Sequence, residues 1–189
     1  MLAAVDPRYQ SVLAMQGKPI NAAKRSPGAV AKYVWGRRLR QQLAAAADEP
    51  FATSNDAMVE PDPDTSPFDR ILIAMDGDVD GIHCAALTIV LVRHLLPRWI
   101  EMLRVHRIHP PLFENTAAGE IHYAWTQPEH RNQLDRFEQL GIPDVQTVRY
   151  RGLAAMPTRV LRRTVVDAKT RFATPIDPST ADSITRQLS

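Results

Sequence analysis

The chain has 189 residues, of which 44% are hydrophobic and 23% are charged, and this composition is typical of a globular domain with a buried core. No apolar run reaches the roughly 18 residues that a membrane-spanning helix needs. The N-terminal residues lack the apolar stretch of a secretory signal. The single cysteine, Cys84, excludes an internal disulfide. These features predict a cytoplasmic protein without a membrane partner.

The charge is unevenly distributed along the chain. Residues 48–69 hold seven acidic side chains and no Lys or Arg. The remaining 14 acidic residues face all 23 Lys and Arg residues, so the rest of the chain carries a formal net charge of +9. A basic body suits a polyanionic partner such as DNA. A solvated basic surface with a disordered acidic loop is the alternative that charge alone leaves open.

The sequence pattern predicts alternating helices and strands. Ser26-Pro27 is typical of a helix start, and residues 48–67, with four prolines and few large apolar residues, predict a flexible acidic loop. Helices are expected over 28–47, 80–104 (divided at Pro97), 128–140 and 157–167, and strands over 70–75, 105–108, 120–126 and 145–149. This alternation predicts an α/β fold with a mostly parallel sheet.

The most informative stretch is an acidic turn, Asp76-Gly77-Asp78-Val79-Asp80-Gly81, which lies between the predicted strand 70–75 and the predicted long helix. Alternate residues of an extended segment point to one side, so the three aspartates can converge at the sheet edge. Clustered carboxylates repel one another unless a cation neutralises them, and oxygen ligands select Mg²⁺, Mn²⁺ or Ca²⁺. The turn therefore indicates a metal site for phosphate chemistry.

Two other interpretations of this turn compete with a metal site of that kind. An EF-hand loop needs a glutamate at its twelfth position, which here is Leu87. The second alternative is an acidic helix N-terminus, where aspartates cap the helix and favour its dipole. That interpretation explains one aspartate more readily than three at alternate positions.

Four collinear stretches resemble motifs of the TOPRIM domain of type IIA DNA topoisomerase B subunits, the gyrase B and topoisomerase IV B group. Ile71 to His83 (ILIAMDGDVDGIH) resembles the signature in which a strand ends in three aspartates, glycine and histidine. The others are Tyr9 to Asn21 (YQSVLAMQGKPIN), Pro110 to Phe113 (PPLF), and Arg149 to Met156 (RYRGLAAM) with Asp167 to Arg171 after it. The resemblance implies a TOPRIM-like sheet flanked by helices in a single domain over residues 1–172, followed by a tail, 173–189.

The resemblance also implies the site residues. In that family the aspartates bind magnesium where DNA is cleaved and rejoined. A Mg²⁺ site, which Mn²⁺ can also fill, is therefore implied at Asp76, Asp78 and Asp80. Contacts to DNA are implied for Lys18, Asn21 and Arg151, of which Arg151 keeps the positive charge of the family's lysine.

Some family features have no counterpart in this sequence. The family domain begins with a strand and a Glu-Gly-Asp-Ser-like motif, whose glutamate is a metal ligand and a candidate general acid/base. Here the first glutamate is Glu49, so the first family strand is expected to be missing and no complete catalytic set is expected in this chain. Ala154-Ala155 stand where the family has Gly-Glu, and Met75 stands where a threonine is common.

Two functional hypotheses result. In the first, the chain supplies the metal site of an ATP-hydrolysing type II DNA topoisomerase, is inactive alone, and acts on DNA with an A-type subunit and an ATPase domain in trans. In the second, it is a degenerate, non-catalytic module that binds DNA or a topoisomerase subunit and regulates it. A stand-alone nuclease or primase fragment ranks last because of the RYRGLAAM match. Each hypothesis leaves open whether the chain forms a homo-oligomer.

Overall fold

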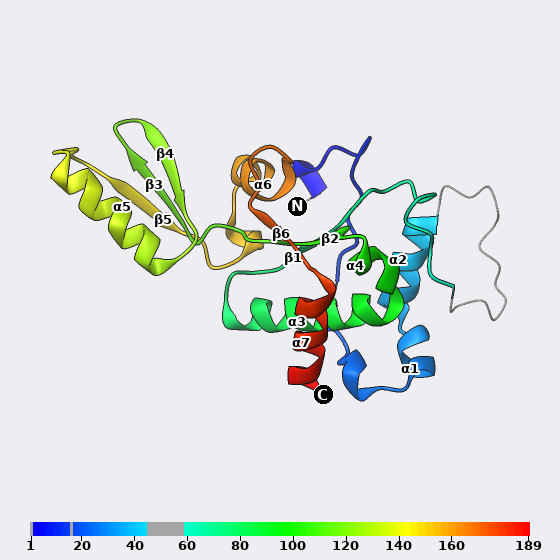
Figure 1. Ribbon diagram of the computed structural model, residues 1–189. Helices are drawn as coiled ribbons and strands as arrows, with labels where there is room; N and C mark the ends of the chain where they lie inside the picture. The colour runs from blue at the N-terminus through cyan, green and yellow to red at the C-terminus, as the bar shows by residue number, and fades with distance from the viewer. Residues whose placement is uncertain (1, 16, 45–58) are drawn as a thin grey trace. The chain divides into compact units, whose positions relative to one another are not determined.

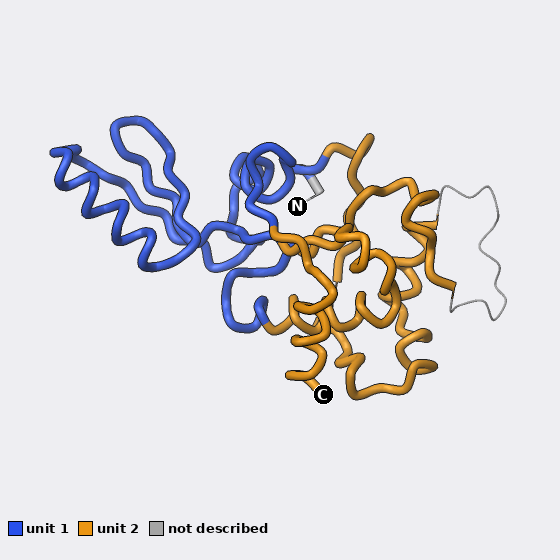
Figure 2. Tube along the Cα trace, in the orientation of Figure 1, with its two compact units in different colours: residues 1–5, 74–82, 108–173 blue, residues 6–73, 83–107, 174–189 orange. Residues whose placement is uncertain are grey.

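The computed structural model describes residues 2–15, 17–44 and 59–189. The chain divides into two compact units, which Figure 2 shows in different colours. Unit 1 comprises Met1–Val5, Ala74–Ile82 and Ile108–Ala173, and unit 2 comprises Asp6–Ile73, His83–Arg107 and Thr174–Ser189. No helix in the described part is both long and apolar enough to span a membrane. The expectation of one domain over 1–172 with a tail stays a prediction.

Unit 2 is built around a three-stranded sheet with the strand order β1-β2-β6. Its elements are a 3-10 turn η2 (Ala22–Lys24), α1 (Pro27–Ala31), α2 (Val34–Ala44), β1 (Ile71–Ala74), α3 (Val79–Leu95), α4 (Pro97–Glu101), β2 (Val105–Ile108), β6 (Ala173–Pro175) and α7 (Pro178–Leu188) (Figure 1). The unit boundary falls within β1, α3, β2 and β6. β1 connects to β2 through α3 and α4, the type of helical crossover that neighbouring parallel strands require.

The apolar run of α3 forms much of the core of unit 2. Val90, Leu91 and Val92 are fully buried, as is Trp99 of α4. Pro97 cannot donate a backbone hydrogen bond inside a helix, but it suits a first helical position. The helix therefore ends before Pro97 and α4 begins there, as the sequence predicted.

Unit 1 contains an antiparallel sheet with the order β4-β3-β5. Its elements are η1 (Leu2–Ala4), β3 (Phe113–Ala117), β4 (Glu120–Ala124), α5 (Gln127–Gln139), β5 (Gln146–Arg149), η3 (Leu153–Ala155), α6 (Thr158–Leu161) and the π-helical turn η4 (Arg162–Val166). In Figure 1, α5 runs along this sheet. Phe113 stacks on His130 of α5 with ring centroids 4.1 Å apart, and Asn115 Nδ2 donates a 2.8 Å hydrogen bond to Gln133. These contacts fix α5 on one face of the sheet.

The α/β class is confirmed, but the sheets are smaller than expected and less parallel. Besides the antiparallel sheet of unit 1, β2 and β6 also run in opposite directions. The His109 amide donates to the Phe172 carbonyl at 2.9 Å and the Ile176 amide donates to the Val105 carbonyl at 2.8 Å, so numbers rise along one strand as they fall along the other. The sequence pattern did not predict β3 or β6, and these strands supply the antiparallel pairs.

The described part of the acidic segment packs on unit 2. Residues 48–58 of the predicted loop lie outside the described residues. After them, Glu60 accepts a 2.8 Å hydrogen bond from the Arg98 backbone amide, and Asp64 accepts one of 2.8 Å from the Arg104 guanidinium. Burial raises the pKa of the Glu60 carboxyl, although the bond from Arg98 opposes the shift. This part of the segment is therefore held against α4 and the start of β2.

Candidate functional site

The acidic turn follows β1 and belongs to unit 1, where it meets the Arg149 to Met156 stretch. The backbone amide of Leu153 donates a 2.7 Å hydrogen bond to Oδ1 of Asp76. The two residues are 77 positions apart. The Asp76 residue itself is exposed. Two of the stretches that carry the TOPRIM resemblance are thus joined by this contact.

Two glycines make the close approach to Asp76 feasible. A Cβ on Gly152 would lie 2.7 Å from both Cγ and Oδ1 of Asp76, and a Cβ on Gly81 would lie 2.1 Å from its carbonyl oxygen. Real side chains do not tolerate such distances, so residues with a Cβ at 152 or 81 would displace the aspartate or its backbone. Gly81 and Gly152, one from each motif stretch, therefore leave the space that Asp76 occupies.

Asp78 caps α3. Its Oδ1 accepts a 2.7 Å hydrogen bond from the Gly81 amide, and its carbonyl accepts one of 2.9 Å from the Ile82 amide. Both contacts are typical of an N-cap residue. Asp80 is exposed in the first turn of the helix. The interpretation of the turn as an acidic helix N-terminus accounts for Asp78. It does not account for Asp76, whose carboxylate accepts its bond from Leu153 and not from an amide of α3.

The carboxylates of the acidic turn suit a cation site that is open to water and phosphate better than one that is enclosed by protein ligands. Among the residues that the structure describes, no group of three or more His, Cys, Asp or Glu side chains is arranged to hold a metal ion. Asp76 and Asp78 each use Oδ1 in a bond to a backbone amide, and each carboxylate has a second oxygen. Mg²⁺ commonly takes one or two carboxylates and completes its shell with water and phosphate oxygens. The residues present are compatible with that arrangement.

The predicted DNA contacts are divided between the units. Arg151 is exposed in unit 1, directly before Gly152. Lys18, which is exposed, and Asn21 belong to unit 2. The Asn21 side chain accepts a 3.1 Å hydrogen bond from the Ala23 amide and donates one of 2.8 Å to the Leu188 carbonyl. Asn21 therefore starts η2 and fastens the end of α7, a structural role that the sequence did not reveal.

A buried carboxylate that the sequence analysis missed lies in unit 1. Glu114 of β3 is 3% exposed. It accepts a 2.8 Å hydrogen bond from the Tyr150 hydroxyl and bonds of 2.6 and 3.3 Å from the Arg159 guanidinium. Burial acts to raise the pKa of Glu114, but the bonds from Arg159 and Tyr150 outweigh it and the pKa is lowered. Burial and the Glu114 charge together raise the pKa of the Tyr150 hydroxyl.

This cluster joins three elements of unit 1. Glu114 lies on β3, Tyr150 follows β5 and precedes Arg151, and Arg159 lies on α6. Arg159 is thus paired with a buried carboxylate. No local sequence signal indicated this ion pair, because neighbouring residues of a strand point to opposite faces and a glutamate beside Phe113 is therefore not expected to be buried.

Known proteins resemble this chain in sequence and in fold. No protein-family model matches the chain. A crystal structure of the DNA-binding, cleavage and re-ligation domain of Plasmodium falciparum topoisomerase II superposes with a TM-score of 0.54 at 16% identity, and the match covers 78% of this chain and 19% of that one. The chain therefore shares the fold of part of that domain.

The chain also has relatives that are similar to it in sequence. The B subunit of DNA topoisomerase 4 from Haemophilus influenzae is 30% identical over 169 residues, which are 89% of this chain and 25% of that protein. The B subunit of DNA gyrase from Archaeoglobus fulgidus is 27% identical over 169 residues, 89% of this chain and 24% of that protein. The chain is a distant homologue of the B subunits of DNA gyrase and topoisomerase IV. It spans about a quarter of the length of these relatives.

Proposed function

We propose that the chain is the TOPRIM-like, magnesium- and DNA-binding part of a type II DNA topoisomerase. It contributes the metal site for DNA cleavage and religation, is inactive alone, and works in the cytoplasm with an A-type subunit and an ATPase domain in trans. The contact of Asp76 with Gly152 and Leu153 carries this proposal. This contact joins two motif stretches that lie far apart in the sequence, which supports a shared role for them in one site.

In this proposal Asp76 and Asp78 would hold the ion, with Asp80 in support. Such an ion would supply positive charge to the phosphate oxygens of the DNA. Arg151, one residue before Gly152, contacts the DNA backbone nearby, because a guanidinium matches phosphate. Lys18 and Asn21 contribute further DNA contacts from unit 2.

The proposal is tested by calorimetric titration of the full chain with Mn²⁺ and Mg²⁺. The Asp76→Asn/Asp78→Asn double variant is expected to lose binding. Asparagine caps helices about as well as aspartate, so α3 keeps its start and the loss reports on charge rather than folding. Asp135→Asn, on α5 and away from the acidic turn in the sequence, is the matched control and keeps wild-type binding. Equal heats in the wild type and the double variant would contradict a metal site at this turn.

A degenerate, non-catalytic module that binds DNA or a topoisomerase subunit is the second candidate. The absence of a carboxylate at Ala154-Ala155 favours it. Fluorescence anisotropy with labelled duplex DNA and pull-down with an A-type subunit separate the two candidates. The module predicts that Asp76→Asn leaves both kinds of binding intact and that no DNA cleavage accompanies them. Cleavage that depends on Asp76 would exclude it.

A further inference from the structure

Arg40 of α2 is a buried cation. The residue is 3% exposed, and its Nη2 donates a 2.9 Å hydrogen bond to the Ala31 carbonyl at the end of α1. Within the described part of the chain, no acidic side chain forms an ion pair with it. Burial, together with the charge of Arg37, lowers the pKa of the Arg40 guanidinium. Buried charges in proteins are normally paired, so a carboxylate partner is expected for this side chain.

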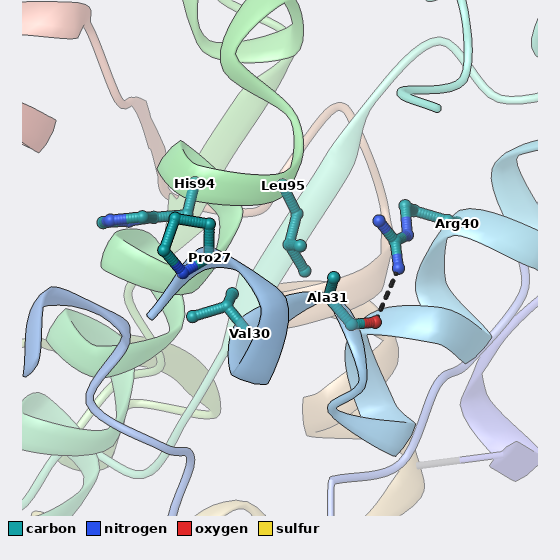
Figure 3. Close-up of a pocket in the computed structure, with 6 residues that line it drawn as sticks. All are labelled: Pro27, Val30, Ala31, Arg40, His94 and Leu95. Carbon is teal, nitrogen blue, oxygen red and sulfur yellow. Dashed lines mark hydrogen bonds between the residues drawn. The ribbon is translucent and has the colours of Figure 1, made fainter. Parts of the chain in front are cut away.

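The guanidinium borders a cavity of about 70 Å³ in unit 2 (Figure 3). In Figure 3 the Arg40 side chain reaches toward Ala31 and Leu95. The cavity is lined by Pro27, Val30, Ala31, Arg40, His94 and Leu95. Its volume is several times the roughly 10–15 Å³ that one water needs. A small head group with a short apolar stem therefore fits.

The chemistry of the lining selects the occupant. A guanidinium has five N–H donors, and Ala31 uses one of them. The remaining donors suit a carboxylate, which guanidinium groups bind through two parallel hydrogen bonds. A phosphate dianion needs more donors than a single guanidinium provides, and Pro27, Val30 and Leu95 of the lining offer no polar side chain. The occupant that matches both the charge and the lining is a monoanionic carboxylate on a short methylene stem.

The surroundings attract an acidic partner. Residues 7–44 contain no Asp or Glu. Exposed cations on α2, directly after α1 and in the turn before α1 are Lys24, Arg25, Lys32, Arg37 and Arg38. A basic surface of this kind raises the local concentration of anionic partners and speeds their association.

We propose that this cavity receives a glutamate side chain from an acidic partner protein. The carboxylate pairs with Arg40, and the methylenes pack on Val30 and Leu95. The site is independent of the acidic turn, which lies in the other unit.

The test is an NMR titration of the full chain, labelled with ¹⁵N, with sodium butyrate as the probe. Butyrate is expected to shift the Arg40 Nε–H signal and the Val30 and Ala31 amides to saturation, and neutral butyramide is not. An acetylated, amidated pentapeptide with a central glutamate is expected to shift the same signals, and its glutamine version is not. Arg40→Gln weakens butyrate binding by about tenfold or more, because it removes a charge-assisted pair. Arg38→Gln, at an exposed position of the same helix, keeps wild-type affinity.

The absence of a saturable butyrate shift, or an equal shift in Arg40→Gln, overturns the proposal. A response to inorganic phosphate or duplex DNA but not to butyrate overturns the carboxylate assignment. If Arg40→Gln fails to fold, the wild-type comparison of butyrate with butyramide decides.

Discussion

The amide of Leu153 and the carboxylate of Asp76 lie 2.7 Å apart, although 77 positions separate the two residues. Gly152 lies beside this contact without a side chain, so that the carboxylate can approach the backbone. One oxygen of Asp76 is anchored, and the second takes no part in this bond. The arrangement orients the carboxylate before any ligand arrives, and such preorganisation lowers the free-energy cost of binding.

Substitution of Gly152 by alanine is expected to weaken divalent-ion binding. The added Cβ would lie 2.7 Å from Cγ and Oδ1 of Asp76 and push the carboxylate from its position. We expect a loss of Mn²⁺ affinity of about tenfold, equivalent to about 1.4 kcal/mol, in calorimetric titration. Gly28→Ala is the control, because a Cβ there meets no atom within 4 Å. Unchanged affinity in Gly152→Ala would show that the contact has no bearing on the ion.

Removal of the cap at Asp78 is expected to destabilise the start of α3. Asp78→Ala loses the 2.7 Å bond from the Gly81 amide, which should lower the free energy of unfolding by about 1 kcal/mol. Asp78→Asn keeps an acceptor and should retain most of that stability. Urea unfolding followed by circular dichroism compares the two. An equal loss in both variants would mean that charge rather than capping is what Asp78 supplies.

The buried carboxylate of Glu114 predicts a pH-dependent contribution to stability. Its pKa in the folded chain lies below its ordinary value of 4.5, so the stability it contributes is present above that value and is lost as the pH falls through the lowered pKa. Glu114→Gln should lower the free energy of unfolding at pH 7 by about 1–3 kcal/mol. The deficit relative to wild type should shrink below pH 4.5. Glu138→Gln, at an exposed position of α5, should show neither effect.

Tyr150 and Glu114 are expected to be energetically coupled. Tyr150→Phe removes the 2.8 Å bond to Glu114 and should cost about 1 kcal/mol. In the Glu114→Gln background the same change should cost less, since residues that share a hydrogen bond are not additive. A double-mutant cycle from urea unfolding measures the difference. Strict additivity would mean that the tyrosine acts only through its packing.

The local pattern predicted most elements because their signals are local. β2 covers 105–108 as expected, and the Thr126 cap with Pro128 in the first turn starts α5. The predicted helix 28–47 instead ends as α1 and restarts as α2. No glycine or proline marks that interruption, and the bond from Arg40 to the Ala31 carbonyl, nine positions away, is tertiary. Local helix propensities cannot predict such a tertiary contact.

Two of the elements that the sequence pattern did not predict, β3 and α7, were missed for different reasons. β3 joins β4 through a turn in which Ala118 and Gly119 have φ values of 50° and 82°, and alanine is an unusual residue for the first of these positions. α7 was missed although its signal is present: Asp177 caps it and Pro178 opens it, as Ser26 and Pro27 do for α1.

The sequence indicated the residues of the candidate site better than their arrangement. It singled out Asp76 and, through Arg151, the stretch that meets it. It did not predict that a backbone amide would be the contact or that Gly152 would be needed, because backbone donors carry no residue signature. Asn21 matched a motif, yet both ends of its amide bind the chain itself.

The hydrogen bond between Leu153 and Asp76 also makes one amide proton a reporter of this turn. An amide exchanges with solvent only when its bond opens, so the exchange rate of the Leu153 proton measures how often the carboxylate lets go of the backbone. Any ligand that prefers the anchored carboxylate slows that exchange, and any ligand that draws the carboxylate away accelerates it. Ligand binding at the acidic turn can therefore be followed through the amide of Leu153, a residue that carries no charge.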